Sequence, residues 1–328
     1  MSTLPDLLYR PPEAALEHVR ARPLLGTIVE IAATGAALGP VQAAIERAFL
    51  AVEKVQALMS YHDRQSDVSR INRFAHECAI AVSEHTWRVL TAAQSLAEAS
   101  GGLFDITVAP TLTKLGFLPR HADFPRISGH GNWRHVELLS DNRVQLTRKL
   151  RIDLSGIAKG YAVDLAVQAL ALSGMTAGRV NAGGDLRLFG ESAQAIHVRQ
   201  PNAPTRTLAL VELTHGAAAT SAGYYAIRRH HGRIVTPLIH PHTRIACAAG
   251  RSVTILAEDC MTADALTKIV YADPQRAISV LNHFNARALM VESDSLTGGC
   301  RVYDSTASGK ESRWAHWGMA NATGKNHD

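Results

Sequence analysis

Residues 178–256 consist almost entirely of short strand patterns, and this run limits the folds that the chain can adopt. Apolar residues recur at helical spacing in other parts of the chain, both before and after the run. Because the strands follow one another instead of alternating singly with helices, the sequence predicts an α+β fold with largely antiparallel sheets and packed helices. The strand patterns are RVNAG, DLRLFG, AIHVR, LALVEL, AAATS, RIVTPLI and RSVTILA, and the helical patterns cover 41–59, 84–100, 157–173, 261–272 and 274–284.

Composition excludes several classes of protein. The 328 residues carry a formal charge of +5, but Lys and Arg are scattered, so we expect no nucleic acid as partner. No stretch of about 18 uncharged apolar residues occurs, and the N-terminus has no apolar signal core, so neither a membrane span nor a secretory signal is expected. Four cysteines lie far apart without a CxxC motif. Thiols in a reducing cytoplasm are therefore expected rather than a disulfide framework or a zinc site.

The segment Arg151–Asp185 combines a strand, a glycine-rich turn and a helix that begins near Lys159. Helix N-termini favour anions, and Gly156 and Gly160 allow a ligand to approach the backbone closely. Lys159 opposes the helix dipole in the first turn, and an anionic partner would explain its presence. A glycine-rich turn with a solvated lysine fits the same residues equally well.

Three further segments have both a structural and a chemical interpretation. The Gly-Gly-Asp turn that ends at Asp185 is usually a hairpin. In Gly102–Thr107, Phe104 suits the core and Asp105 suits a cap. Asp264 lies in the first turn of a helix, where it either complements the helix dipole or serves as an oxygen ligand for Mg²⁺ beside a diphosphate.

Seven segments occur together in an order that resembles the ApbE-like family of FAD:protein FMN transferases, formerly called thiamine-biosynthesis lipoproteins. The resemblance covers roughly residues 20 to 292. Each motif is weak alone, and the specificity comes from their order. The segments are Leu25-Gly26-Thr27, Ser60-Tyr61 with Ser66 and Asn72, Gly102–Thr107, Asp153–Asp164, Gly183–Asp185, Thr220-Ser221 and Thr262–Leu266.

The resemblance implies a fold of two coupled lobes and an enzyme that binds FAD and uses Mg²⁺. Such an enzyme transfers the FMN moiety to a Ser or Thr hydroxyl of a target flavoprotein and releases AMP. The implied regions are an extension at 1–20, a transferase domain at 21–295 and a polar tail at 296–328. The implied FAD-site residues are Tyr61, Phe104, Asp105, Lys159, Asp164, Gly184 and Asp185; the metal would be held by Asp264 with main-chain oxygens near Gly156 and Thr267; and Lys159, Asp264 and Lys268 would act in catalysis.

The chain departs from the family pattern at two places. Lys268 stands where a metal-binding threonine is usual, and an ammonium cannot ligate Mg²⁺ but could contact the pyrophosphate as a point cation. In the segment that usually reads His-Ile-Ile-Asp-Pro-x-Thr-Gly, the chain has Pro237, His240 and Arg244 in place of the His, Asp and Gly. Two hypotheses follow: an active FMN transferase, or an FAD-binding protein that has lost transfer and carries FAD or slowly hydrolyses it to FMN and AMP.

Overall fold

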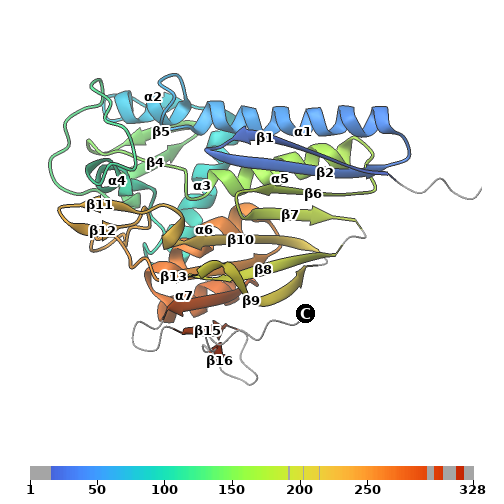
Figure 1. The fold of residues 1–328 in the computed structure, drawn as a ribbon. Coiled ribbons are helices and arrows are strands. Elements are labelled where there is room, and N and C mark those ends of the chain that lie inside the picture. The colour runs from blue at the N-terminus through green and yellow to red at the C-terminus, as the bar shows by residue number, and fades with distance from the viewer. Residues whose placement is uncertain are drawn as a thin grey trace, which may run out of the picture.

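The computed structural model describes residues 16–190, 193–201, 203–213, 215–293, 299–305 and 315–320. Its centre is a nine-stranded sheet in the order β1-β2-β6-β7-β10-β13-β14-β15-β16, in which every neighbouring pair is antiparallel (Figure 1). The strands are β1 (Leu16–Leu24), β2 (Thr27–Gly35), β6 (Ala177–Ala182), β7 (Asp185–Phe189), β10 (Gly216–Ala222), β13 (Arg251–Ala257), β14 (Arg287–Ser293), β15 (Cys300–Asp304) and β16 (Ala315–Ala320).

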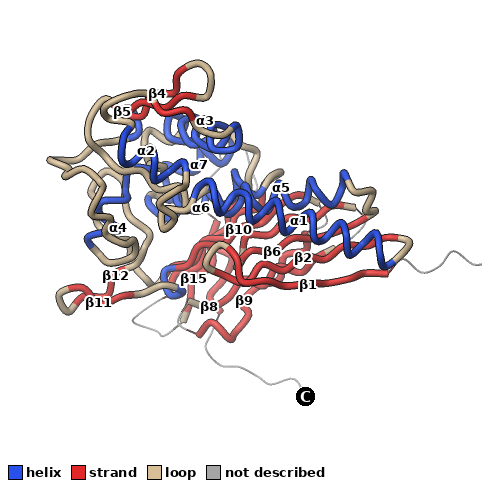
Figure 2. The backbone as a smooth tube through the Cα atoms, turned by 90° about the horizontal axis from the view of Figure 1, so that it is seen from above, coloured by secondary structure: helices blue, strands red, loops and turns tan. Residues whose placement is uncertain are grey.

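Helices cover one face of this sheet (Figure 2). They are α1 (Leu38–Met59), α5 (Ala158–Leu172), α6 (Cys260–Ala272) and α7 (Pro274–His283). α1 buries a stripe that includes Val41, Ile45, Phe49 and Val52, which is the spacing of one helical face. α6 is buried on several sides, because it lies among α5, α7 and strands β10 and β13. Its polar residues are therefore held inside the molecule.

The opposite face of the sheet is covered by a two-stranded ribbon, β8 (Gln194–Gln200) and β9 (Ala203–Leu213). Val198 of the ribbon packs with Leu289 and Val291, whereas Leu213 packs with Leu186 of β7. The sheet is thus apolar on both faces, and the ribbon shields the face that the helices leave uncovered.

A second part of the molecule lies beside the sheet. It contains α2 (Asp67–Phe74), α3 (Glu84–Ala99), α4 (Ala109–Lys114), a small sheet of β3 (Ile80–Ala81), β5 (Arg143–Leu146) and β4 (Val136–Leu139), and the hairpin β11 (Arg228–His230) and β12 (Arg233–Val235) (Figure 1). Asn72 attaches α2 to the chain near the site: its amide donates to the carbonyl of Ile152 at 2.9 Å, and its Oδ1 accepts from the N–H of Ile152 at 2.8 Å.

The α+β fold with antiparallel sheets is confirmed, but residues 60–79 are not the continuous loop that their polarity indicates. Helix α2 forms there because the Ser66 side chain accepts a hydrogen bond from the N–H of Ser69 and because Val68 and Ile71 are buried. The domain boundaries at 20 and 295 stay predictions. β1 crosses the first of them, while β15 and β16 lie within the predicted tail, whose other residues are largely outside the described ones.

Candidate functional site

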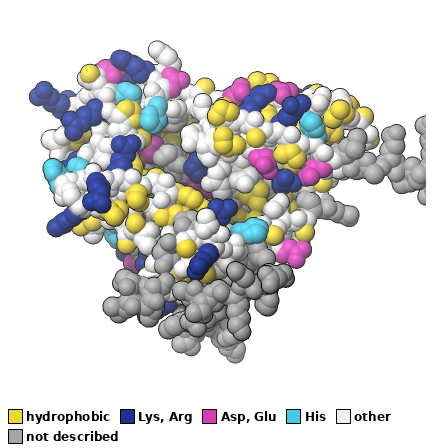
Figure 3. All heavy atoms as spheres, viewed as in Figure 1, with side chains coloured by type: hydrophobic (Ala, Val, Ile, Leu, Met, Phe, Trp, Pro, Cys, Tyr) yellow, Lys and Arg dark blue, Asp and Glu magenta, His cyan; other side chains and the backbone are white. Residues whose placement is uncertain are grey.

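A cavity of about 940 Å³ opens where the helical part meets the large sheet. This volume lies near the upper end of the range of about 300–1,000 Å³ that is usual for small-molecule sites, so a large ligand fits. On this side of the molecule, basic and hydrophobic side chains gather around the hollowed middle of the surface (Figure 3). The residues of the lining that matter below are Thr27, Phe104, Asp105, Gly156, Lys159, Gly183, Gly184, Ser221, Pro237, Pro241 and Lys268.

The first turns of α5 and α6 touch each other beside the cavity. A Cβ atom at Gly160 would overlap the carbonyl oxygen of Cys260, so only glycine allows this contact. The N–H of Gly160 donates to Oδ2 of Asp264 at 3.2 Å. The N-cap residue of α5, Ile157, makes no side-chain cap, and the first turn carries no acidic residue, so Asp264 of α6 supplies the carboxylate at this helix end. The positive end of α5 is therefore directed to the site without a carboxylate of its own.

Two ion pairs attach α5 to β7. Lys159 contacts Asp185, and Arg187 contacts Asp164 at 2.7 Å. Asp185 and Arg187 are two residues apart and so project from the same face of the strand. Asp164 also accepts from the main-chain N–H groups of Cys260 and Met261, at 2.9 and 2.8 Å, which links α6 to the same point.

Burial and neighbouring charges set the ionisation of these groups. Burial alone lowers the pKa of Lys159, but Asp185 and Asp264 outweigh it, so its pKa is raised and the ammonium is kept. For Asp185, burial and the charge of Asp264 outweigh Lys159 and raise its pKa to about 6. For Asp264, burial raises the pKa, but Lys159 and Lys268 together lower it below its ordinary value.

Lys268 lies one helical turn after Asp264 on α6. Its ammonium contacts Oδ1 of Asp264 and also donates to the main-chain carbonyl of Asp264 at 2.9 Å. Asp264 is 0% exposed, whereas the Lys268 side chain is 23% exposed and lines the cavity. The charge that meets a ligand at this point is therefore the ammonium and not the carboxylate.

A turn between β6 and β7 closes the same end of the cavity. Gly183 and Gly184 have φ angles of +64° and +101°, in the region that favours glycine. A Cβ atom at Gly183 would overlap the side chain of Thr27, which lies at the start of β2. The Gly-Gly-Asp motif is thus both a tight hairpin and a wall of the cavity.

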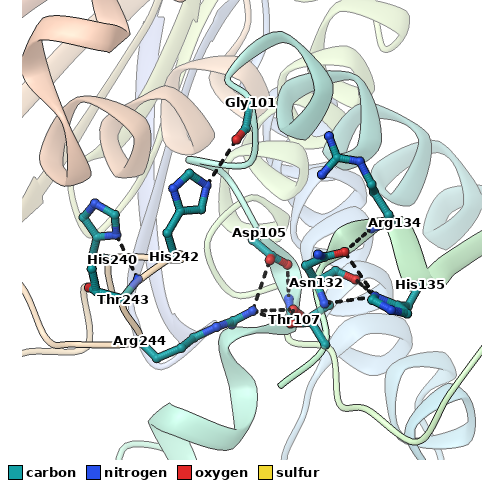
Figure 4. Close-up of polar contacts among 11 residues, drawn as sticks. Gly101, Asp105, Thr107, Asn132, Arg134, His135, His240, His242, Thr243 and Arg244 are labelled. Carbon is teal, nitrogen blue, oxygen red and sulfur yellow. Dashed lines mark hydrogen bonds and ion pairs between the residues drawn. The ribbon is translucent and has the colours of Figure 1, made fainter. Parts of the chain in front are cut away.

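The loop that contains the substituted residues Pro237, His240 and Arg244 is held on the other wall. Arg244 has a φ of +57° and extends its guanidinium to Oδ2 of Asp105 at 3.3 Å, Oγ1 of Thr107 at 3.1 Å and the carbonyl of Gly131 at 2.5 Å (Figure 4). His242 donates from Nε2 to the carbonyl of Gly101 at 3.1 Å.

Of the predicted site residues, Phe104, Asp105, Gly156, Lys159, Gly184 and Lys268 line the cavity, and Asp185, Asp264 and Thr267 lie directly behind it. Asp164, on α5, pairs with Arg187 of β7 and accepts from two main-chain N–H groups of α6. Tyr61 does not line the cavity; it is 2% exposed and packs with the rings of His121 and Phe124, so its place beside FAD stays a prediction.

Sequence reasoning missed Arg187 as the partner of Asp164. The sequence did contain a signal for it: Arg187 lies two residues after Asp185 in one strand pattern, so both side chains project from the same face.

The donor set around Asp264 does not fit Mg²⁺ in this arrangement. Mg²⁺ requires about six oxygen ligands in near-octahedral geometry. Both carboxylate oxygens of Asp264 are engaged, by Lys268 and by the N–H of Gly160. Oγ1 of Thr267 donates to the carbonyl of Asp264 at 2.6 Å and hydrogen-bonds Oγ of Ser221 at 2.7 Å. Within the described residues, no three His, Cys, Asp or Glu side chains come together to hold a metal.

This fold, with a large cavity lined by the N-terminus of α5 and a glycine-rich hairpin, matches a known family. The model of the ApbE family matches residues 25–290, and the chain belongs to that family. The FAD:protein FMN transferase of Vibrio cholerae is 29% identical over 255 residues, which cover 73% of this chain and 76% of the relative. The enzyme of the same name from Haemophilus influenzae is 26% identical over 266 residues, covering 74% and 77%.

Solved structures agree with this assignment. The ApbE protein of Thermotoga maritima superimposes with a TM-score of 0.76 at 28% identity, covering 84% of this chain and 94% of that one. The flavin transferase ApbE of Vibrio cholerae gives a TM-score of 0.71 at 27% identity, covering 89% and 98%.

Among the described residues, no helix is long and apolar enough to cross a membrane.

Proposed function

We propose that this chain is an FAD:protein FMN transferase that binds FAD in the 940 Å³ cavity. It transfers the FMN moiety to a Ser or Thr hydroxyl of a target flavoprotein and releases AMP. The observation that carries the proposal is the meeting of the α5 N-terminus, Lys159, Lys268 and the Gly183-Gly184 turn at one end of a cavity large enough for a dinucleotide. Such an end suits a pyrophosphate, because N–H groups and cations converge there.

In the proposed reaction the acceptor oxygen attacks the phosphorus on the FMN side. The new O–P bond forms, and the bond from that phosphorus to the bridging oxygen breaks, so the bridging oxygen leaves with AMP. The proton of the acceptor hydroxyl passes to a base or to water. Charge that develops on the phosphates is stabilised by Lys159, Lys268 and the α5 N-terminus, while Asp185 keeps Lys159 in place.

The sequence also led us to expect Mg²⁺ and a cytoplasmic location. No step above uses the metal, because the donors around Asp264 do not fit it. For the location, the support is that the four cysteines lie far apart in the sequence without a CxxC motif.

A labelling assay tests the proposed function. The protein is incubated with FAD and a target domain that bears the family's Ser/Thr acceptor motif, and flavin fluorescence is read on a denaturing gel while AMP is quantified. We expect covalent labelling with one AMP released per label. A target with the acceptor residue changed to Ala is the control and should stay dark. Tight FAD binding without labelling or AMP release, with validated targets, would support a carrier role instead.

A further inference from the structure

We propose that the Lys268 ammonium takes the place of the divalent cation, so that this chain transfers FMN without a bound metal. The inference rests on the proposed function, and it concerns the group that neutralises the phosphates. Its starting point is the contact of Lys268 with two oxygens of one residue, Oδ1 and the main-chain carbonyl of Asp264.

The carboxylate oxygen Oδ1 is the hard donor that a metal at Asp264 would need first. An ammonium has three donor hydrogens, so it can satisfy both oxygens and still present one N–H to a ligand. A metal could use them only after Lys268 had been displaced, which would leave two cations competing for one carboxylate.

The remaining surroundings hold Lys268 in this position. The second carboxylate oxygen of Asp264 accepts from Gly160 at 3.2 Å, so the carboxylate is oriented by α5 as well as by α6. A Cβ atom at Gly156 would lie 3.5 Å from Cε of Lys268, so the aliphatic stem passes directly over the turn before α5. The ammonium is thereby positioned beside the N-terminus of α5.

Lys159 completes the arrangement from the other side. Lys159 and Lys268 are each attached to a buried carboxylate, Asp185 and Asp264, and both lysines line the cavity. Two fixed ammonium groups and a helix N-terminus provide positive charge along the pyrophosphate. In the transfer step, Lys268 stabilises the charge on the phosphate oxygens as the bridging oxygen departs with AMP, and no other reactant is needed.

The first test removes metals from the wild-type protein with EDTA and follows labelling and AMP release. We expect the initial rate to change by less than about twofold, because charge neutralisation by Lys268 does not depend on a metal. Lys268→Thr removes the ammonium, and its EDTA-treated rate should fall by about 10²-fold, as is typical for loss of one charge-stabilising group. Added Mg²⁺ should restore much of that rate. Lys268→Arg keeps a cation and should remain insensitive to EDTA.

Exposed Lys149→Thr is the matched control, because it makes the same substitution outside the site. It should behave as the wild type with and without EDTA. Loss of wild-type labelling in EDTA and its recovery with Mg²⁺ would overturn the proposal.

A second test does not need transfer activity and so separates this proposal from the proposed function. Mn²⁺ binding to the FAD-loaded protein is followed by electron paramagnetic resonance. We expect no stoichiometric Mn²⁺ binding by the wild type and one bound Mn²⁺ in Lys268→Thr. Stoichiometric binding by the wild type would refute the role of Lys268 even if no target were ever labelled. Labelling that fails under every condition, together with no Mn²⁺ in the wild type, would count against the proposed function alone.

Discussion

The buried carboxylate of Asp185 has opposite effects on stability and on the site. Its ionised form lowers the stability of the fold but holds Lys159 in place. Asp185 is 2% exposed, and burial together with the charge of Asp264 raises its pKa from 3.8 to about 6 despite the contact with Lys159. Ionisation therefore costs folding free energy, although the ionised form is the one that holds Lys159.

The pH dependence of stability follows from this shift. Because the folded pKa is above the ordinary value, the contribution of Asp185 to stability is full below about pH 4 and is lost as pH rises through about 6, by up to about 3 kcal/mol. Asp185→Asn cannot ionise. Denaturant unfolding between pH 4 and 8 should show the wild type losing stability relative to Asp185→Asn over this window.

Asp141→Asn, at an exposed position, controls for the change of charge and should keep a constant difference from the wild type. A constant difference for Asp185→Asn as well would contradict the raised pKa.

At the scale of elements, the contact between α5 and α6 positions most of the site. Gly160 lets the two first turns touch, and Asp164 and Asp264 then bind across the junction through main-chain N–H groups. Lys159 and Lys268, one on each helix, reach the same end of the cavity only because of this contact. The glycine is therefore required by the neighbouring helix and not by its own φ angle.

Gly160→Ala should separate the helices. Its Cβ would meet main-chain atoms of Cys260 and Met261, which cannot move as side-chain ends can. We expect a loss of about 2–3 kcal/mol in unfolding free energy, within the range for overpacked cores, together with weaker FAD binding. The measurements are denaturant unfolding and fluorescence titration with FAD.

Gly250→Ala is the control, because its Cβ would make only an ordinary 3.5 Å contact with Ser293. It should change stability by less than about 1 kcal/mol. Equal stability of the two variants would show that α5 and α6 adjust without cost.

At the scale of the whole molecule, Arg244 attaches the loop between β12 and β13 to the helical part beside the cavity. It belongs to the loop after β12, and its side chain, 12% exposed, reaches Asp105, Thr107 and Gly131 in the helical part (Figure 4). Burial raises the pKa of Asp105, and the Arg244 charge opposes that shift. The arginine that replaces a usual glycine thus joins the loop to the opposite wall.

Two substitutions separate the side chain of Arg244 from its backbone. Arg244→Ala loses the contacts to buried Asp105 and keeps an unfavourable φ of +57°, so we expect a loss of about 3 kcal/mol. Arg244→Gly loses the same contacts but adopts this φ freely, and should be about 1 kcal/mol more stable than Arg244→Ala. Thermal or urea unfolding measures both. Wild-type stability in either variant would argue against a role of Arg244 in attaching the loop to the helical part.

Local sequence patterns were sufficient to predict much of the fold of this protein. The spacing of Val41, Ile45 and Val52 identified α1, and the run of short strands identified an antiparallel α+β fold, because periodicity reports which face of an element is buried. The glycines near Lys159 and Asp185 predicted the end of the cavity where we propose that the pyrophosphate binds, since close approach to backbone needs glycine.

Contacts between distant residues could be seen only in three dimensions. Lys268 contacts Asp264 within one helix, but the other partner of that carboxylate, the N–H of Gly160, is 104 residues away in the sequence. Arg244 and Asp105, which also contact each other, are 139 residues apart. The packing of Tyr61 with Phe124 is another contact that no local pattern indicates. A sequence pattern shows which face of a single element is buried. Which side chains then pack together or form ion pairs depends on which elements the folded chain brings together.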